Sequence, residues 1–384
     1  MAGPLAGIRV VDLSQVVSGP LAGGWLADQG ADVIKVEGPG GDPVRWLGPG
    51  KGDLSSTYIS INRGKRAVAA DLKTEDGRAL VEALIRKADV LIENFRPGVL
   101  DKLGFGWDAA RAMNPRLIYC SITGYGRDGP YAGLRAYDPM IQASSGIAAT
   151  QPGPDGEPQL IRTLICDKVT GLTAAQAITA ALFARERSGE GQRIEVAMLD
   201  AALAFNWPEG SFNQGFMDEP PPVSPAAGKF TRLWKTSDGA VALASFQDHE
   251  FTALCAALNR PELATDERFA TGGARARNIR VWGPILADAV SKLTSAQFMA
   301  GCLQHGAGGS VVHSLDEVLE NPQVLHNGSI AIIEHGDLGR VRTARHPIRF
   351  SGTPVAQPQP AGRRGQHSDQ VRAELGLPAQ SGAR

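Results

Sequence analysis

Short β-branched runs alternate with helical patterns along the first half of the chain. The runs at residues 8–13 and 32–37 enclose a helical stretch at 20–29, and this spacing is typical of a βαβ unit. Further strands are predicted at residues 66–72, 90–94, 116–122 and, after a long helix over 169–186, within 188–199. Continuous apolar strands between amphipathic helices indicate a parallel sheet with both faces covered. The first half therefore predicts an α/β fold.

The pattern changes after a proline-rich stretch at residues 218–228, which indicates a domain boundary. An Asp-Gly pair between two apolar runs at 233–245 predicts a hairpin, and helices are expected to about residue 306. Two capping boxes predict helix starts, one formed by Thr294 with Gln297 and one by Ser314 with Glu317. The second part therefore predicts an α+β arrangement.

Composition narrows the classes of partner. The 384 residues carry 39 Lys and Arg against 40 Asp and Glu, a net charge of −1, so no long-range field attracts nucleic acid or a membrane surface. The four cysteines are too far apart for a zinc or redox pair and predict no disulfide framework, so we expect a reducing cytoplasm and no metal. The longest uncharged stretch, at residues 169–184, is too short to span a bilayer.

The first strand–helix turn, SGPLAGG at residues 18–24, raises the question of a dinucleotide site, since Glu37 ends the second strand. Its glycines do not form GxGxxG, and Pro20 lacks the backbone N–H that a phosphate needs, so an ordinary βαβ unit is favoured. A Walker A lysine, HExxH and GxSxG are absent from the sequence, which argues against kinase, zinc-protease and α/β-hydrolase chemistry.

Asp167 stands between an apolar run and the long uncharged helix. One interpretation is that its side chain caps this helix, because Asp is among the favoured N-cap residues. The other is that a carboxylate at a helix start in apolar surroundings acts as a covalent nucleophile. One residue can do both, and both interpretations remain open at this point.

Several sequence blocks together resemble the class III CoA-transferases, the CaiB/BaiF family that includes formyl-CoA transferase and the α-methylacyl-CoA racemases. The match covers nearly the whole chain in the family's order. The blocks are GIRVVDLSQVVSGP (7–20), GADVIKVEGPGGD (30–42), NRGKR (62–66), DVLIENFRPGVLDKLGF (89–105), SITGYGRDGPYA (121–132), AYDPMIQASSG (136–146), TGLTAAQAITAALFARERSGEGQRIEVAMLDA (170–201) and LDEVLENPQVLHNG (315–328).

The resemblance implies a Rossmann-like large domain with a parallel sheet, a smaller α+β domain and an interlocked homodimer. The large domain is expected over residues 1–227, the small domain over 228–330, and residues 331–384 are expected to return to the large domain. CoA or an acyl-CoA is implied as substrate, in a cleft between domains, with no tightly bound cofactor. Asp167 matches the family's catalytic aspartate. The CoA-binding positions match Val17, Ser18, Ala70, Asp71, Leu72, Lys73, Asn94, Phe95, Arg96, Lys102, Leu134, Arg135, Ala136 and Tyr137.

The cations among these positions suit the phosphates of CoA, to which Lys and Arg make charge-assisted hydrogen bonds. An ionised Asp167 is able to attack the acyl-CoA carbonyl and expel the thiolate, which leaves a mixed aspartyl anhydride. The thiolate then forms an aspartyl-CoA thioester, and the acceptor acid takes over the CoA by the reverse steps. An anhydride is labile in water, so the site must exclude water and offer N–H groups to the oxyanion.

Departures from the family pattern distinguish between reactions. The racemases resemble this chain but have a His where Tyr137 stands, and racemisation requires two bases on opposite faces of Cα. Tyrosine, with a reference pKa of about 10, is a poor replacement at neutral pH. Asp138 matches an acidic position near the substrate, so Tyr137 and Asp138 are candidates for orienting the acceptor; packing for Tyr137 and capping for Asp138 are the alternatives.

Formyl-CoA transferase carries a glutamine where this chain has Val17 and an arginine where it has Gly38, and its glycine-rich flap is not evident near residues 215–230. We therefore expect a dicarboxylate or longer acceptor, with succinyl-CoA as donor, rather than formate and oxalate. The alternatives are a 2-methylacyl-CoA racemase and a non-catalytic CoA-binding protein.

Overall fold

The computed structural model describes residues 3–153, 155–211, 213–219 and 232–379, and the chain divides into two compact units. The first unit comprises Met1–Ser211 together with Gln323–Arg384, and the second comprises Phe212–Pro322. The domain boundaries that the family resemblance implies, at residues 228 and 330, lie later than these bounds, and the proline-rich stretch at 218–228 begins after the first of them. Most of that stretch lies outside the described residues.

A six-stranded parallel sheet forms the centre of the first unit, in the order β5-β2-β1-β6-β7-β8. Its register places Val11 of β1 opposite Ile34 of β2 on one side and Leu91 of β6 on the other. The expected α/β class is confirmed, because these strands are nearly continuous buried runs. The strands are β1 (Arg9–Asp12), β2 (Asp32–Glu37), β5 (Arg66–Ala69), β6 (Val90–Glu93), β7 (Ile118–Thr123) and β8 (Gln192–Ala197).

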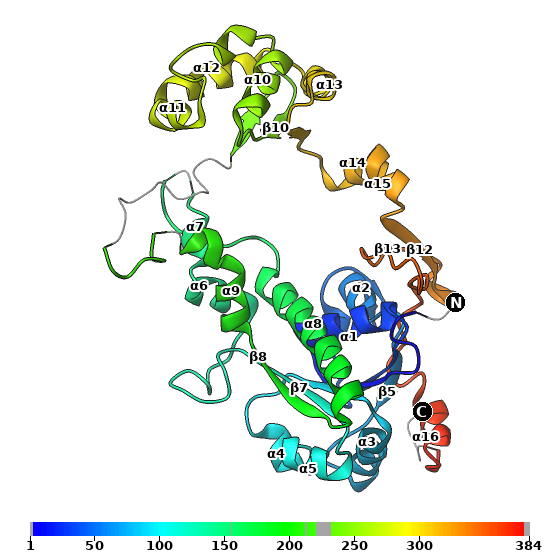
Figure 1. Ribbon diagram of the computed structural model, residues 1–384. Coiled ribbons are helices and arrows are strands. Elements are labelled where there is room, and N and C mark those ends of the chain that lie inside the picture. Colours follow the sequence, from blue (N-terminus) through cyan, green and yellow to red (C-terminus); the bar gives the residue numbers. More distant parts are fainter. Residues whose placement is uncertain (1–2, 154, 212, 220–231, 380–384) are drawn as a thin grey trace. The chain divides into compact units, whose positions relative to one another are not determined.

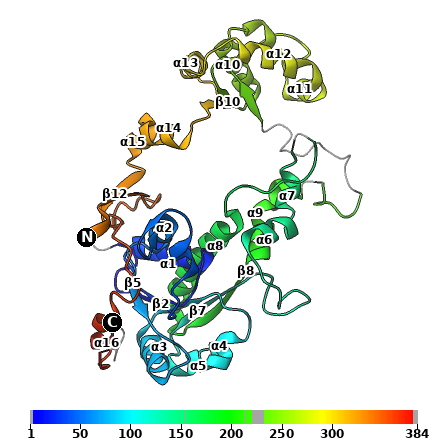
Figure 2. The same cartoon turned by 180° about the vertical axis from the view of Figure 1, so that it is seen from behind.

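Helices cover the two faces of this sheet, as Figures 1 and 2 show. On one face α1 (Ser18–Asp28) and α8 (Ile165–Ser188) enclose a core that includes Val10, Ile92 and Ile178. On the other face α3 (Glu75–Lys87), α4 (Val99–Leu103) and α5 (Trp107–Met113) pack against a second core. Thr74 caps α3 as predicted, because its side chain accepts a hydrogen bond from the backbone N–H of Gly77 at 3.1 Å.

The end of the chain protects one edge of the sheet. The backbone N–H of His367 donates to the carbonyl of Ala67 on β5 at 2.9 Å, and the N–H of Ala67 donates to the His367 ring at 3.0 Å. The N–H of Ala69 donates to the Ser368 hydroxyl at 3.1 Å. Pairing of this kind satisfies backbone groups that an open edge strand leaves exposed.

The second unit combines a small antiparallel sheet with helices. Its strands β9 (Leu233–Lys235) and β10 (Ala240–Leu243) form the expected hairpin, and β11 (Gly309–Val311) pairs with β10. Both predicted capping boxes are present, at Thr294 and at Ser314. The other elements are α10 (Asp248–Ala257), η3 (Pro261–Ala264), α11 (Gly272–Arg277), α12 (Ile279–Ser291), α13 (Ser295–His305) and α14 (Leu315–Glu320).

The first unit also contains the other helices and strands that the structure describes. Among the described residues, no helix is both long and apolar enough to cross a membrane. The other helices and strands of the first unit, which include the antiparallel pairs β3–β4 and β12–β13, are η1 (Pro43–Trp46), β3 (Gly50–Lys51), β4 (Leu54–Ser55), α2 (Ser56–Asn62), α6 (Asp138–Ser144), α7 (Ile147–Thr150), α9 (Met198–Gly210), α15 (Pro322–Asn327), β12 (Ile330–Glu334), η4 (Gly336–Leu338), β13 (Arg340–Ala344) and α16 (Ser368–Glu374).

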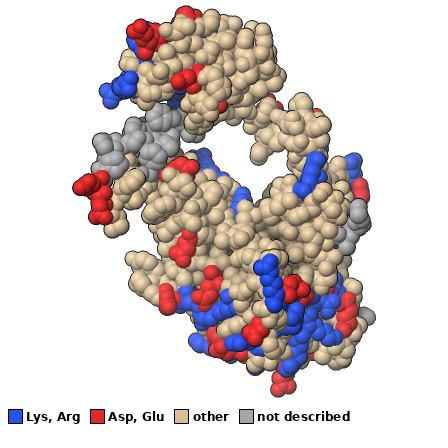
Figure 3. Space-filling model, in the orientation of Figure 1, with Lys and Arg blue, Asp and Glu red and all other residues tan. Residues whose placement is uncertain are grey.

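Charges of both signs cover the side of the first unit that carries α3, α4 and α5. In the view of Figure 3, Lys and Arg are intermingled there with Asp and Glu. Such mixing produces no broad field of one sign, which agrees with the net charge of −1.

Candidate functional site

The sheet reverses its strand order between β1 and β6. From β1 the chain builds outward to β2 and β5, and it then returns to the other side of β1 to form β6, β7 and β8. In open α/β sheets, ligands bind outside the carboxyl ends of the strands at such a switch point. The segments after β1 and β6 are therefore the first place to look for a site.

The expected CoA-binding residues lie at this edge of the sheet. Each group follows the carboxyl end of a strand, apart from Lys102, which lies within α4. Val17 and Ser18 follow β1, residues 70–73 follow β5, residues 94–96 follow β6, and residues 134–137 lie between β7 and α6.

These residues differ in what they expose. Lys73, Arg96, Lys102 and Arg135 are exposed cations, as a phosphate ligand requires. Val17 is buried among apolar side chains of η1, β4 and α2, so its side chain lines no open pocket in this chain. A Cβ built on Gly38 would meet nothing within 4 Å. Of the two departures from formyl-CoA transferase, only Gly38 therefore lies beside open space.

Asp167 is the third residue of α8, whose N-cap is Leu164. The interpretation that Asp167 caps this helix is therefore wrong. The cap comes from another segment, because the Asp138 carboxylate Oδ2 accepts a hydrogen bond from the backbone N–H of Asp167 at 3.0 Å. The Asp167 side chain is thus left for another role, and it is buried with 8% of its surface exposed.

The surroundings of Asp167 raise the pKa of its carboxyl group from 3.8 to about 6. Burial is the largest cause, and the negative charge of Asp138 adds to it. The backbone N–H and hydroxyl of Ser18 form hydrogen bonds that act in the opposite direction, as does the charge of Lys168. Asp167 is therefore a carboxylate at neutral pH, but one that is poorly solvated and correspondingly reactive.

The neighbouring Cys166 is not a rival nucleophile. Burial, together with the charges of Asp138 and Asp167, raises the pKa of its thiol to about 12. A thiol with this pKa stays protonated at neutral pH, and the thiol is a much weaker nucleophile than the thiolate. The candidate nucleophile among the described residues at the start of α8 is therefore the Asp167 carboxylate.

Asp138 is held in place by Gln142, one turn further along α6. The Gln142 side-chain amide donates to Asp138 Oδ1 at 2.5 Å, and its oxygen accepts from the backbone N–H of Ile161 at 2.9 Å. Asp138 is 1% exposed, and its two oxygens serve Gln142 and Asp167. This geometry suits a group that positions and charges the start of α8 better than one that binds an acceptor acid.

Tyr137 has a different environment from the acid beside it. It is the N-cap residue of α6, yet its side chain makes no capping hydrogen bond and is half exposed. The buried packing considered as an alternative for Tyr137 is therefore not what the structure has. An exposed ring next to the start of α6 is available to contact a ligand.

A glycine allows Ser18 to approach Asp167 closely. Gly171 lies one turn after Asp167, and a Cβ built there would lie 2.7 Å from the backbone oxygen of Ser18 and 3.1 Å from Leu21 Cβ. Only a residue without a side chain permits this contact between α1 and α8. Sequence reasoning overlooked Gly171, although a glycine inside a helix is a signal because it costs about 1 kcal/mol relative to alanine.

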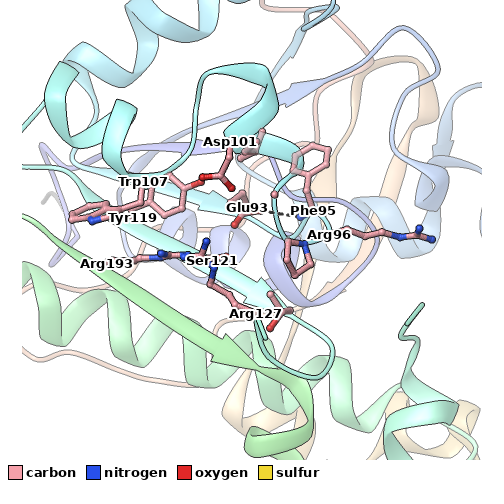
Figure 4. Close-up of a pocket in the computed structure, with 13 residues that line it drawn as sticks. Glu93, Phe95, Arg96, Asp101, Trp107, Tyr119, Ser121, Arg127 and Arg193 are labelled. Carbon is pink, nitrogen blue, oxygen red and sulfur yellow. Dashed lines mark hydrogen bonds between the residues drawn. The ribbon is translucent and has the colours of Figure 1, made fainter. Parts of the chain in front are cut away.

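A small pocket lies on the opposite face of the sheet, and Figure 4 shows the residues that line it. It contains Phe95 and Arg96, but its other members include Glu93, Tyr119 and Trp107 on the side of α4 and α5. Burial raises the pKa of Glu93 to about 6, although the N–H of Phe95 donates to this carboxylate at 2.9 Å. Asp167 is not among the lining residues, so this pocket is separate from the start of α8.

Glu37 does not have the role that a dinucleotide site requires. Its carboxylate is buried and accepts two hydrogen bonds from Arg45, one of them at 2.7 Å, and another from the Tyr58 hydroxyl at 2.9 Å. These partners leave no room for a ribose. Within the described parts of the chain, no group of three or more His, Cys, Asp or Glu is arranged to hold a metal ion.

Comparisons with known proteins agree with this fold. Residues 5–368 match the model of CoA-transferase family III. The chain is 39% identical to the succinate–glutarate CoA-transferase of Agrobacterium fabrum, over 97% of this chain and 96% of that protein. It is 37% identical to the acetyl-CoA:oxalate CoA-transferase of Acetobacter aceti, over 91% and 90%.

A solved structure of a CaiB/BaiF family protein from Brucella suis superposes with a TM-score of 0.84 at 36% identity, covering 98% of this chain and all of that one. Its fold and the family match extend over nearly the full length, so the resemblance found in the sequence blocks is confirmed. This chain belongs to CoA-transferase family III and is an enzyme of that class.

Proposed function

We propose that this enzyme transfers CoA from succinyl-CoA to a dicarboxylic acid, with the Asp167 carboxylate as nucleophile. The observation that carries the proposal is the environment of this carboxylate. It is buried, it lies against the first turn of α1 beside the switch point of the sheet, and its pKa of about 6 leaves it ionised at neutral pH. A poorly solvated carboxylate beside the sheet edge to which we assign CoA binding is suited to attack a thioester.

The reaction needs no outside energy, because one thioester is exchanged for another. An Asp167 oxygen bonds to the acyl carbon of the donor thioester, and the carbon–sulfur bond breaks to release the CoA thiolate. The thiolate attacks Cγ of Asp167 in the resulting anhydride and frees the donor acid. The acceptor carboxylate then attacks Cγ and expels the thiolate, which finally attacks the acceptor's acyl carbon and releases Asp167.

The Ser18 backbone N–H and hydroxyl are the donors that the chain offers at this carboxylate. They act on the same oxygens that accept charge when Cγ becomes tetrahedral, so they support both attacks on Cγ. Burial of Asp167 and of Ser18, which is 3% exposed, limits the hydrolysis of the anhydride by water.

The acceptor class rests on the relatives and on one position of this chain, Gly38. Proteins similar to it along most of their length are named for glutarate and for oxalate, both dicarboxylic acids. Gly38 leaves open space where formyl-CoA transferase carries an arginine. A longer dicarboxylate such as glutarate therefore suits this chain better than formate does.

We assign CoA binding to the segments that follow β1, β5, β6 and β7. The exposed cations Lys73, Arg96, Lys102 and Arg135 supply charge for the phosphates. Asp138 and Tyr137 take separate roles in this proposal. Asp138 positions Asp167, while the exposed Tyr137 ring contacts the substrate.

The transfer itself is tested by mass spectrometry of the thioesters. Incubation with succinyl-CoA and glutarate should yield glutaryl-CoA and succinate, and acetyl-CoA, formyl-CoA, oxalate and formate complete the panel. Failure of every donor–acceptor pair contradicts the transferase assignment. Deuterium uptake at Cα of a 2-methylacyl-CoA without any acceptor acid would instead establish a racemase.

The covalent steps are tested by trapping. Hydroxylamine added during turnover should convert Asp167 into a hydroxamate, which is located by peptide mass spectrometry, and Asp167→Asn should abolish both label and turnover. An unlabelled residue 167 in an active enzyme removes the proposed mechanism. Glu186→Gln is a matched control, because this exposed carboxylate lies near the far end of the same helix.

We also propose that two copies assemble as the interlocked homodimer expected from the family. Large apolar side chains are exposed on α8 and α9, among them Phe183, Phe205 and Trp207. Exposed apolar surface of this kind marks an interaction face. Analytical ultracentrifugation should give the mass of a dimer, and a monomer at micromolar concentration contradicts the assembly.

A further inference from the structure

The loop between β1 and α1 carries a backbone conformation that is unfavourable for its sequence. Val16 has a φ of 66°, in the left-handed region that β-branched residues almost never adopt. Two residues later, Ser18 presents its N–H and hydroxyl to Asp167. Strain of this kind persists only where the surroundings enforce it, and it concentrates at functional sites. We call residues 14–17 the strained loop.

Side chains from distant segments bind the backbone of the strained loop. Asn94, which follows β6, accepts from the N–H of Gln15 and donates to its carbonyl, both at 2.7 Å. Asp12 accepts from the N–H of Ser14 at 3.0 Å. The Asn94 amide is therefore committed to the loop on both sides, so this loop and the segment after β6 move as one piece.

A buried ion pair holds the two ends of the strained turn. Lys35 Nζ lies 2.8 Å from Asp42 Oδ2, and both side chains are fully buried. Lys35 also donates to the carbonyl of Ser14 at 2.5 Å, while Asp42 Oδ1 accepts from the N–H of Val16 at 3.1 Å. The ion pair thus binds two backbone groups of the strained loop, the carbonyl of Ser14 and the N–H of Val16.

The same loop touches the first turn of α1 directly. A Cβ built on Gly19 would lie 2.3 Å from Ser14 Cβ and Oγ, so Ser14 packs against the residue that follows Ser18. A shift of Ser14 is therefore passed to the start of α1. Through Gly171, that start is also in contact with α8 near Asp167.

Stability alone does not explain the ion pair. Burying two charges costs about as much as their attraction returns, and apolar residues of similar volume often serve the fold equally well. Burial by itself would lower the pKa of Lys35, but the charges of Asp12, Asp42 and Glu37 together outweigh it and raise the pKa. The lysine thus remains charged and keeps donating to Ser14 and Asp42.

We propose that Lys35 and Asp42 are positioning residues of the transferase reaction: they hold Val16 in its left-handed conformation so that the N–H and hydroxyl of Ser18 face Asp167. The inference rests on the proposed function of Asp167. Neither residue touches the reacting atoms; both act through the strained loop.

The proposal has a consequence for the pH dependence of turnover. Asp167 is faced by Asp138 from α6, by Lys168 from its own helix and by the Ser18 donors. Removal of the Ser18 hydrogen bonds leaves burial and Asp138 less opposed, so the pKa of Asp167 rises above its present value of about 6. The acid limb of kcat/KM then moves to higher pH.

Two double variants that differ only in the side chain at position 42 provide the test. Lys35→Met with Asp42→Ala removes both charges and leaves the N–H of Val16 without its acceptor. Lys35→Met with Asp42→Asn removes the same charges but keeps an acceptor oxygen at position 42. We expect the Ala variant to lose about 10- to 100-fold in kcat, the range for displaced catalytic groups, with its acid limb at higher pH. The Asn variant should recover most of both properties.

Equal kcat and equal acid limbs in the two variants would overturn the proposal. Asp28→Asn is the control for loss of a buried ion pair as such, because Asp28 pairs with Arg63 at the other end of α1. It should lower stability and leave the acid limb in place. If Asp167→Asn retains turnover, the proposed function fails and the positioning role fails with it. If Asp167→Asn is inactive but the two double variants at Lys35 and Asp42 have equal kcat and equal acid limbs, only the positioning role fails.

Hydrogen exchange on the wild-type enzyme covers the case in which the Ala variant does not fold. The N–H groups of Gln15 and Val16 should exchange as slowly as those of β1, since both are bound by buried side chains. If these two N–H groups exchange at the rate of an open loop, the positioning role of Lys35 and Asp42 is contradicted without any substitution.

Discussion

Asp138 Oδ2 accepts a hydrogen bond from the backbone N–H of Asp167 at 3.0 Å, so one carboxylate caps the helix that carries the other. This arrangement has two effects of opposite kind. The hydrogen bond fixes the start of α8, whereas the negative charge of Asp138 raises the pKa of the Asp167 carboxyl beyond what burial does. The Asp167 carboxylate is thereby held in place and kept less stable as an anion.

The first prediction concerns the pH dependence of the wild-type enzyme. In the proposed mechanism Asp167 attacks as the carboxylate, and the pKa of this group is raised to about 6. Therefore kcat/KM should be constant above this pH and fall about tenfold for each unit below it, because this ratio reports ionisations of the free enzyme. A pH–rate profile with a donor whose own groups do not titrate near 6 measures the limb.

Asp138→Asn should move that limb to lower pH. The substitution removes the negative charge that raises the pKa of Asp167 and keeps an oxygen that can accept from its N–H. Turnover at pH 5 should then be higher relative to pH 8 than in the wild type. Asp108→Asn, an exposed change on α5, is the control and should leave the limb unchanged. A limb that does not respond to Asp138→Asn contradicts the electrostatic role.

Asp167→Asn should stabilise the folded protein at neutral pH. A carboxyl whose pKa rises on folding favours the folded state below the unfolded pKa and loses this contribution as pH rises through the folded pKa. A rise from 3.8 to about 6 corresponds to about 3 kcal/mol at pH 8, as an upper bound. Asparagine keeps an acceptor for Ser18 without the charge.

Urea denaturation at two pH values tests this trade between activity and stability. At pH 8 the Asn variant should require more urea than the wild type, and at pH 4 the difference should shrink to near zero. Equal midpoints at pH 8 would show that the buried charge carries no cost.

The strand positions could be predicted closely, because they depend on local patterns. The run at 32–37 coincides with β2, and Thr74 caps α3 as its neighbours predict. Asp167 shows where local reasoning ends: its sequence suits a cap, but the cap comes from Asp138, which is distant in sequence. Lys35 illustrates the same limit. A lysine within an apolar run reveals neither its partner Asp42 nor its complete burial.

Gly171→Ala should weaken both the fold and turnover. Alanine favours the helix by about 1 kcal/mol, but its Cβ would lie 2.7 Å from a backbone oxygen of Ser18, which cannot move without α1. Overpacking of this kind costs about 1–3 kcal/mol, so a net loss of up to about 2 kcal/mol is expected, because the contact is with backbone and cannot be relieved by a side chain. Because Ser18 moves away from Asp167, kcat should also fall about tenfold or more.

Gly273→Ala is the matched control for Gly171→Ala. Gly273 is exposed on α11, and a Cβ there would meet only the flexible end of Arg277 at 3.4 Å. The control should be neutral or slightly stabilising, and kcat should not change. A Gly171→Ala enzyme with wild-type stability and kcat would show that the close contact of α1 and α8 is not required.

The last prediction concerns the recognition of CoA. Arg96 follows β6 at the switch point and is exposed. If it contacts a CoA phosphate as proposed, Arg96→Ala removes a charge that acts in both the ground and transition states. The expected result is a KM for succinyl-CoA raised about 5- to 20-fold with kcat little changed, because uniform binding affects KM alone. Salt screens such contacts, so the ratio of variant to wild-type KM should decrease when NaCl is raised from 0.05 M to 0.5 M. Arg86→Ala is the control. Arg86 is an exposed cation in the last turn of α3, at the end of this helix away from residues 70–73, so its removal should change neither KM nor kcat. If Arg96→Ala and Arg86→Ala behave alike, the phosphates bind elsewhere on the sheet edge.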